Sequence, residues 1–206
     1  MMTNIAVPEL RRYAPDALRM VGIPLGQADE TADMLVWTEA VKGGALRFVQ
    51  TNRARLNWIP RPRPRVVTET PEEAVIDVRG GSLLEFGIRI FDFVCAETVA
   101  TGARQVRVRN VYGAVFLPYL TARAAERGIR VEAHGGSADA EDCERCAELT
   151  LRATVAGAAG GGLDTPAYLD AVDRGIDIDE RDFGTVIQLF EMLRVPTSER
   201  SRSHAG

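Results

Sequence analysis

The stretch that most constrains the fold is residues 104–128, which reads RQVRVRNVYGAVFLPYLTARAAERG. In its first part Val106 and Val108 alternate with arginines, which is the period-two pattern of a half-buried strand. In its second part apolar residues recur at helical spacing, namely Phe116, Leu117, Leu120, Ala124 and Ala125. A strand, a short loop and a helix therefore follow one another. Asn110 and Tyr112 lie where the strand ends, which is where α/β sheets carry binding groups.

The flanking segments extend this alternation of strands and helices. The expected strands are residues 65–70, 74–78, 104–110 and 129–133, and the expected helices between them are residues 83–102 and 115–127. Residues 147–155 alternate apolar and polar side chains, which predicts a further strand, with a helix as the alternative. Residues 165–175 and 179–193 begin with residues that favour helix starts. The pattern predicts an α/β fold whose body is an α/β sandwich.

The N-terminal part is expected to be helical. Three helices are expected, over residues 8–21, 26–44 and 45–56, because each segment places apolar residues three or four apart. The run WIPRPRPR cannot be helical, because each proline lacks an N–H and forces its predecessor into an extended conformation. We interpret it as a stiff linker, with an anion-binding strip as the alternative. The expected division is a helical segment (1–57), a Pro/Arg linker (58–65), an α/β body (66–193) and a polar tail (194–206).

Charge and cysteine usage exclude several classes of function. The net charge of −4 and the pI near 5.4 argue against nucleic acid as the main partner, because binding to phosphates needs a basic surface. No apolar run approaches the roughly 20 residues of a membrane span, and no secretory signal opens the chain, so we expect a cytoplasmic protein without a membrane partner. Cys95, Cys143 and Cys146 are an odd number of thiols, which predicts reduced cysteines. Cys143 and Cys146 form a CxxC pair, but no second pair of this kind completes a zinc site, so no metal is expected.

Several segments together resemble the type 2 malate/L-lactate dehydrogenase family. They are LVWTEAVKGGALRF (35–48), VVTETPEEAVIDVRGG (66–81) and ATGARQVRVRNVYGAVFLPYLTARAAERG (100–128). The last of them is similar to the family's VRNSNHFGAAGYYALMAAEAG and is the most specific of the three. The resemblance implies the fold of that family, with its N-terminal helical segment and α/β body. It also implies a cytoplasmic homodimer that reduces a small 2-oxo acid or cyclic imino acid with NAD(P).

The family's histidines are absent from the matching positions. Its Ser-His-Gly motif, whose histidine is the expected proton donor to the substrate carbonyl, falls here on residues 44–47. Its second histidine falls on Gly113, and the two histidines of this chain, His134 and His204, lie elsewhere. General acid catalysis needs a group of suitable pKa within hydrogen-bond reach of the substrate. The family's mechanism therefore cannot be carried over whole.

Other side chains at or near the matched positions are the candidates for the site. We predict Lys42 and Tyr112 as proton donors, since either can give a proton to a carbonyl. The predicted substrate-binding residues are Arg47, Asn110 and Tyr119. The alternative is that Lys42 neutralises a helix end, Arg47 is solvated and both tyrosines belong to the core. No cofactor-binding residue can be named.

Two functions from different classes remain open. The first is a divergent oxidoreductase that acts on a small 2-oxo or imino acid with NAD(P). The second is a non-catalytic protein of the same fold that binds a small ligand or a protein partner. In either case a small carboxylate is expected to bind near the 110–113 loop and the 42–47 turn, within one chain or across a dimer.

Overall fold

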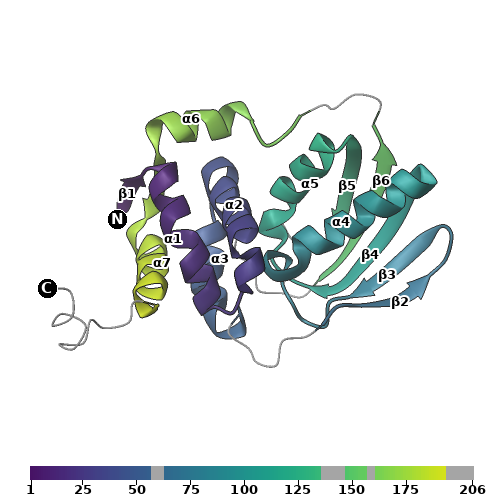
Figure 1. Cartoon of the computed structure of the whole chain (residues 1–206), viewed down its shortest axis with the longest axis horizontal. Coiled ribbons are helices and arrows are strands. Elements are labelled where there is room, and N and C mark those ends of the chain that lie inside the picture. Colours follow the sequence, from purple (N-terminus) through teal and green to yellow (C-terminus); the bar gives the residue numbers. More distant parts are fainter. Residues whose placement is uncertain (57–62, 136–146, 157–160, 194–206) are drawn as a thin grey trace, which may run out of the picture.

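The fold has a helical part and a sheet part that lie side by side (Figure 1). The computed structural model describes residues 1–56, 63–135, 147–156 and 161–193. The predicted α/β class is confirmed, because helices and a mixed sheet alternate along the chain. Cys143 and Cys146, with most of the Pro/Arg linker and the polar tail, lie outside the described residues.

The sheet part is built on five strands in the order β2-β3-β4-β6-β5. These strands are β2 (Arg65–Glu69), β3 (Glu73–Asp77), β4 (Ala103–Val111), β5 (Ile129–Gly135) and β6 (Ala147–Val155). β3 and β4 run parallel, with Asp77 beside Arg109, and the other three pairs are antiparallel. Residues 147–155 thus form the predicted strand and not the alternative helix.

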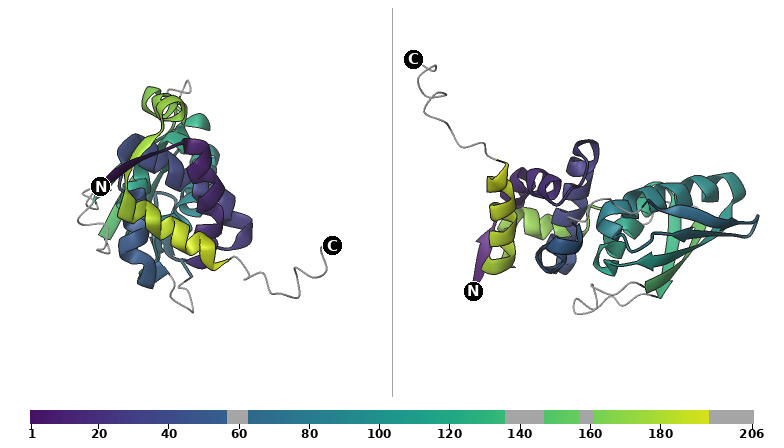
Figure 2. Two further views of the ribbon diagram at one scale, coloured as in Figure 1. Left: turned by 90° about the vertical axis from the view of Figure 1, so that its left-hand side faces the viewer. Right: turned by 90° about the horizontal axis from the view of Figure 1, so that it is seen from below.

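Two helices, α4 (Leu83–Thr101) and α5 (Leu117–Glu126), lie on one face of this sheet (Figures 1 and 2). The strands turn apolar residues toward them, and the buried ones include Val106, Val108, Leu149 and Leu151. α4 begins with a capping box, because the Ser82 hydroxyl accepts from the Glu85 N–H while the Glu85 carboxylate accepts from the Ser82 N–H. A single 3-10 turn, η1 (Ala114–Phe116), precedes α5, so that helix begins slightly later than expected.

The helical part contains segments from both ends of the chain. Its helices are α1 (Val7–Met20), α2 (Leu25–Lys42), α3 (Ala45–Leu56), α6 (Pro166–Arg174) and α7 (Glu180–Met192). A two-stranded antiparallel sheet joins β1 (Met2–Ile5) to β7 (Ile176–Asp179). The sequence does not predict these two strands, because each has only four residues and pairs with a segment more than 170 residues away. Among the described residues, none of the helices has the length and apolar character needed to cross a bilayer.

The C-terminal helices α6 and α7 pack on the N-terminal helices. α7 contacts α1 and α3, and α6 contacts α2. Val186 and Leu189 of α7 are buried, and the ring centroid of Phe190 lies 4.9 Å from that of Tyr13 in α1. The apolar face of α7 thus finds its partners at the opposite end of the chain, which local periodicity does not reveal.

Candidate functional site

The parallel strands β3 and β4 end at the same edge of the sheet, and the two loops that follow them are hydrogen-bonded to each other. The Gly80 N–H donates to the Asn110 carbonyl at 2.8 Å, and the Leu83 N–H donates to the Tyr112 carbonyl at 2.8 Å. We call residues 77–82 and 109–113 the β3–β4 edge. Binding groups in α/β sheets gather at the carboxyl ends of strands, so a site is expected at this edge.

Backbone strain is concentrated at this edge. Arg79 (φ 58°) and Asn110 (φ 54°) are the two non-glycine residues with positive φ in the part of the chain that the structure describes. The Asp77 carboxylate holds both in place, because one oxygen accepts from Asn110 Nδ2 at 3.0 Å and from the Arg79 N–H at 2.8 Å. Such residues persist only where the surroundings enforce them, and they cluster at functional sites.

The same carboxylate is held in its charged form. The hydrogen bond from the Asn110 side chain, and then that from the Arg79 N–H, lower the pKa of Asp77 below its ordinary value, although partial burial opposes them. Arg79 and Arg109 add favourable charge interactions. Asp77 is therefore a fixed anchor that positions two neighbouring residues, and its negative charge is already matched by nearby cations.

Arginines surround the edge. The guanidinium carbon of Arg55, on α3, lies 3.9 Å from the centre of the Tyr112 ring, which is a cation–π contact. Arg79 is exposed in the loop after β3, and Arg109 lies 3.1 Å from Glu148 through its Nε. Guanidinium groups bind carboxylates through two parallel N–H bonds. The arrangement therefore suits a small anion.

Phe48 of α3 packs against the loop of residues 110–113 from the helical part. Its ring centroid lies 5.6 Å from that of Tyr112 and 5.1 Å from that of Phe116. Gly113 has φ 88°, and a Cβ atom there would lie 3.1 Å from the Phe48 ring. The loop and α3, whose first residues belong to the 42–47 turn, thus meet within one chain.

The five predicted site residues do not converge on one point. Asn110 and Tyr112 lie at the β3–β4 edge, as expected, and Tyr112 is buried beneath Arg55. Arg47 is exposed and interacts electrostatically with Asp182 of α7, while Lys42 is exposed in the last turn of α2. The roles assigned to all five stay predictions.

Tyr119 is a core residue of α5. Its ring lies 5.7 Å from Trp37 of α2, and burial raises the pKa of its hydroxyl although a hydrogen bond with Arg123 opposes this. Only 3% of the residue is exposed. This packing agrees with the alternative prediction, in which Tyr119 is a core residue whose hydroxyl group is hydrogen-bonded.

Three further residues at the edge escaped the sequence analysis. Asp77, Arg79 and Arg55 contribute an anchor and two cations. The sequence holds one signal for the first two, since a strand that ends on Asp and is followed by Val-Arg-Gly-Gly marks a tight turn beside a polar group. His134, the one histidine in the part of the chain that the structure describes, is exposed on β5 and lies two strands away from β4.

The turn between α2 and α3, where the family has its Ser-His-Gly, is closed by a half-buried acid, Glu39. Glu39 Oε2 accepts from the Leu46 N–H at 2.9 Å. Burial raises the pKa of Glu39, the amides of Leu46, Ala45 and Gly44 oppose this rise, and Asp182 adds to it. The carboxyl group therefore caps the first turn of α3.

Replacement of Glu39 by glutamine is expected to remove part of the pH dependence of stability. A carboxyl group whose pKa is raised in the folded state stabilises the fold fully below its ordinary pKa of 4.5, and this contribution is lost as the pH rises through the raised value. Glu39→Gln cannot ionise, so the free energy of unfolding of the variant, relative to that of the unsubstituted protein, should increase over this range. Urea titrations at several pH values measure it.

The matched control for this change is Glu9→Gln, at an exposed position in the first turn of α1. It removes one negative charge without altering the α2–α3 turn. If Glu39→Gln and Glu9→Gln change the pH profile equally, the Glu39 carboxyl group does not carry the effect.

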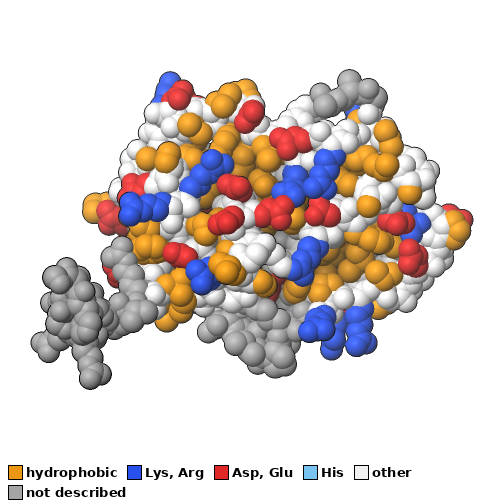
Figure 3. Space-filling model, in the orientation of Figure 1, with side chains coloured by type: hydrophobic (Ala, Val, Ile, Leu, Met, Phe, Trp, Pro, Cys, Tyr) orange, Lys and Arg blue, Asp and Glu red, His pale blue; other side chains and the backbone are white. Residues whose placement is uncertain are grey.

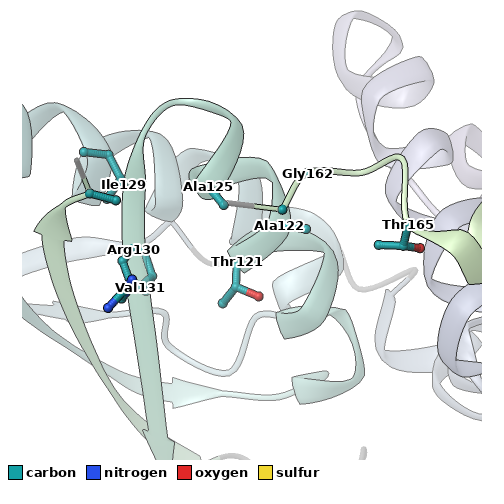
Figure 4. Close-up of a pocket in the computed structure, with 10 residues that line it drawn as sticks. Thr121, Ala122, Ala125, Ile129, Arg130, Val131, Gly162 and Thr165 are labelled. Carbon is teal, nitrogen blue, oxygen red and sulfur yellow. The ribbon is translucent and has the colours of Figure 1, made fainter. Parts of the chain in front are cut away.

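A cavity of about 350 Å³ lies between α5, β5 and the segment before α6 (Figure 4). Small side chains such as Ala122 and Ala125 line it, and Thr121, Arg130 and Thr165 are its polar lining residues (Figure 4). Thr121 and Thr165 already use their hydroxyl oxygens within the chain, since the first donates to Pro118 O and the second accepts from the Tyr168 N–H. Among the described lining residues, this leaves Arg130 as the one charged group of the cavity.

Comparison with known proteins finds similarity in structure only. No protein-family model matches the sequence, and no curated protein matches it either. A dehydrogenase structure from Sinorhizobium meliloti matches 92% of this chain and all of that chain, with a TM-score of 0.69 and 10% identity.

Two malate dehydrogenase structures match a smaller part. Those from Entamoeba histolytica and Pyrococcus horikoshii give TM-scores of 0.53 and 0.52 at 19% and 22% identity, over 66% and 65% of this chain. This chain spans only 40% of the length of each of these two proteins. It therefore has the fold of structures that are malate dehydrogenases and related dehydrogenases, as its resemblance to the type 2 malate/L-lactate dehydrogenases predicts.

Proposed function

We propose that this protein is a divergent oxidoreductase of the malate/L-lactate dehydrogenase fold that binds a small 2-oxo or imino acid at the β3–β4 edge. The observation that carries this proposal is the strained pair Arg79 and Asn110, which the Asp77 carboxylate holds beside a group of arginines. Fixed geometry and positive charge at the carboxyl ends of parallel strands are what a site for a small carboxylate requires.

Residues of this edge and of the helices α2 and α3 would bind different groups of such a substrate. Arg55 and Arg79 would hold the carboxylate, and Asn110, whose amide nitrogen is committed to Asp77, keeps its side-chain oxygen as an acceptor for an imino or hydroxyl group. Tyr112 or Lys42 would give a proton to the carbonyl oxygen or receive one from the alcohol. Arg55 thereby takes the role that the sequence analysis predicts for Arg47.

Two places in the sheet part that could receive the phosphates of NAD(P) do not fit them. A dinucleotide needs donors for its pyrophosphate, which helix N-termini commonly supply. The N-terminus of α4 is closed by its own capping box, where the Glu85 carboxylate occupies the place that a phosphate would need. The cavity beside α5 offers one cation, Arg130. A dinucleotide would therefore need groups other than these two.

The poor fit of NAD(P) to these two places favours a second function, which is a non-catalytic protein of the same fold that binds a small carboxylate. The binding site is the same in both proposals, and the difference lies in the reduced nicotinamide. Titration with NADH and NADPH, followed by the fluorescence of Trp37 and Trp58, separates them. Quenching together with oxidation of the nicotinamide in the presence of pyruvate supports the oxidoreductase, whereas pyruvate binding without either response supports the binding protein.

The carboxylate site itself is tested by calorimetric titration with pyruvate. Arg55→Gln and Arg79→Gln each remove one charged contact, which is worth about 1.5–3 kcal/mol, so each should weaken pyruvate binding roughly ten- to a hundredfold. Arg47→Gln is the matched control, because that exposed side chain interacts electrostatically with Asp182 of α7. If Arg47→Gln weakens binding and the other two variants do not, the site lies at the α2–α3 turn instead.

A further inference from the structure

A second concave surface lies on the α4 side of the sheet, between its edge strand and the first half of that helix. It has a volume of about 290 Å³. We call it the β2–α4 groove, and it is lined chiefly by Arg65, Val66, Phe86, Arg89, Ile90 and Phe93. None of these residues belongs to the β3–β4 edge, so the groove is separate from the proposed carboxylate site.

The groove is apolar along its floor and walls. Ile90 is buried, Phe86 and Phe93 are half-buried, and Val66 on the edge strand is 48% exposed. Hydrophobic side chains scattered singly over a surface are ordinary, whereas several that converge on one concavity mark a binding site. Figure 3 shows hydrophobic side chains gathered where α4 crosses the strands, with basic side chains beside them.

Two arginines at this groove lack the counter-charges that other arginines of the sheet part have. Arg107 and Arg127 make ion pairs with Glu73 and Asp92. Arg65 and Arg89, in contrast, make no ion pair with any carboxylate of the described residues. An apolar concavity with two uncompensated guanidinium groups is complementary to a ligand that has an apolar body and a negative head.

We propose that the β2–α4 groove binds a small carboxylic acid with an aromatic body. The carboxylate lies between Arg65 and Arg89, and the ring packs among Val66, Phe86 and Phe93 in the offset or edge-on contacts that aromatic rings favour. The volume suits a single ring, since it falls near the lower limit of known ligand pockets, which is roughly 300 Å³.

Calorimetric titration with phenylacetate and with its uncharged amide, phenylacetamide, tests this site. Phenylacetate should bind saturably and the amide at least about tenfold more weakly, because only the acid makes the charged contacts. Arg65→Gln and Arg89→Gln should each weaken phenylacetate binding about tenfold or more. Arg130→Gln, which is exposed on β5 and lines the cavity beside α5, should leave it unchanged.

Variants of the other site distinguish the two proposals. Arg79→Gln should weaken pyruvate binding and leave phenylacetate binding intact, whereas Arg89→Gln should do the reverse. Phenylacetate binding that is absent, that is equal for the amide, or that Arg79→Gln weakens and Arg89→Gln does not would overturn the groove proposal without touching the first. Concentration-dependent self-association that Phe93→Ala abolishes would also overturn it, because the groove would then receive a second copy of the chain.

Discussion

Replacement of Phe48 by alanine should lower the free energy of unfolding by about 3–5 kcal/mol, a large part of the roughly 5–15 kcal/mol that a domain possesses. Phe48 is 2% exposed and packs against Tyr112, Phe116 and Gly113. Its removal deletes two aromatic contacts and leaves a cavity between α3 and the loop of residues 110–113. Urea unfolding should show a lower midpoint with an unchanged slope.

Phe48→Leu is the control for this change, because it keeps most of the buried volume and loses only the ring contacts. It should cost about 1–1.5 kcal/mol. Because Arg55 and Tyr112 are held by the same contact between α3 and the loop, Phe48→Ala should also weaken pyruvate binding under conditions where the variant is still folded. A loss of less than about 1 kcal/mol in Phe48→Ala would show that the helical part and the sheet part are not coupled through this residue.

The sequence predicts the sheet best where a strand is long and half-buried. The alternation of Val106 and Val108 with Arg107 and Arg109 in residues 104–110 is confirmed, since the valines are buried and the two arginines form ion pairs with Glu73 and Glu148 on the other face. The strand at 147–155 follows the same rule. Periodicity reports whether a side chain faces the core, and these strands have one buried face.

Long-range partners are what the sequence does not predict. β1 and β7 pair across almost the whole described chain, and α7 packs on α1, because their apolar residues find surfaces that no local pattern identifies. The same limit applies to the site. Arg47 and Phe48 are neighbours in sequence, but successive residues of a helix point about 100° apart. One therefore reaches toward Asp182 and the other toward the loop of residues 110–113.

The position of Asn110 could be predicted from the sequence, whereas its partner could not. The end of an alternating strand locates Asn110, and asparagine adopts positive φ more readily than most residues. Asp77 lies 33 residues earlier and reaches Asn110 only because β3 and β4 are parallel neighbours. Strand order therefore decides which polar residues meet, and spacing along the chain does not.

Replacement of Arg104 by alanine should lower the free energy of unfolding by about 3 kcal/mol, although most surface arginines contribute little. Arg104 lies, like Val106, on the face of the sheet that α4 and α5 cover, and it is 4% exposed. Its Nη1 donates to Thr70 O at 2.6 Å and to Pro71 O at 2.7 Å, and Glu97 lies 3.6 Å from its Nε. Alanine would leave these backbone carbonyls without their charged donor.

The matched control is Arg107→Ala, three residues along the same strand. The Nε of Arg107 lies 2.8 Å from Glu73 Oε1, which is closer than the 3.6 Å between Arg104 and Glu97. The Arg107 side chain is nevertheless 33% exposed, on the face of the sheet that α4 and α5 do not cover. A partly solvated pair of this kind is screened by water, so Arg107→Ala should lower the free energy of unfolding far less than Arg104→Ala does. Burial and the two carbonyl acceptors, and not the presence of an ion pair, should therefore separate the two variants.

The loss in Arg104→Ala should begin at the edge of the sheet. Thr70 and Pro71 form the turn between β2 and β3. In the five-stranded sheet β2 is an edge strand whose one partner is β3. Without Arg104 the turn is released, and hydrogen exchange should accelerate at the β2 amides bonded to β3 before it does in β4. Because Val66 and Arg65 of β2 line one wall of the groove, phenylacetate binding should weaken as well. Equal exchange rates in β2 before and after the substitution would show that β3 alone holds the edge strand in place.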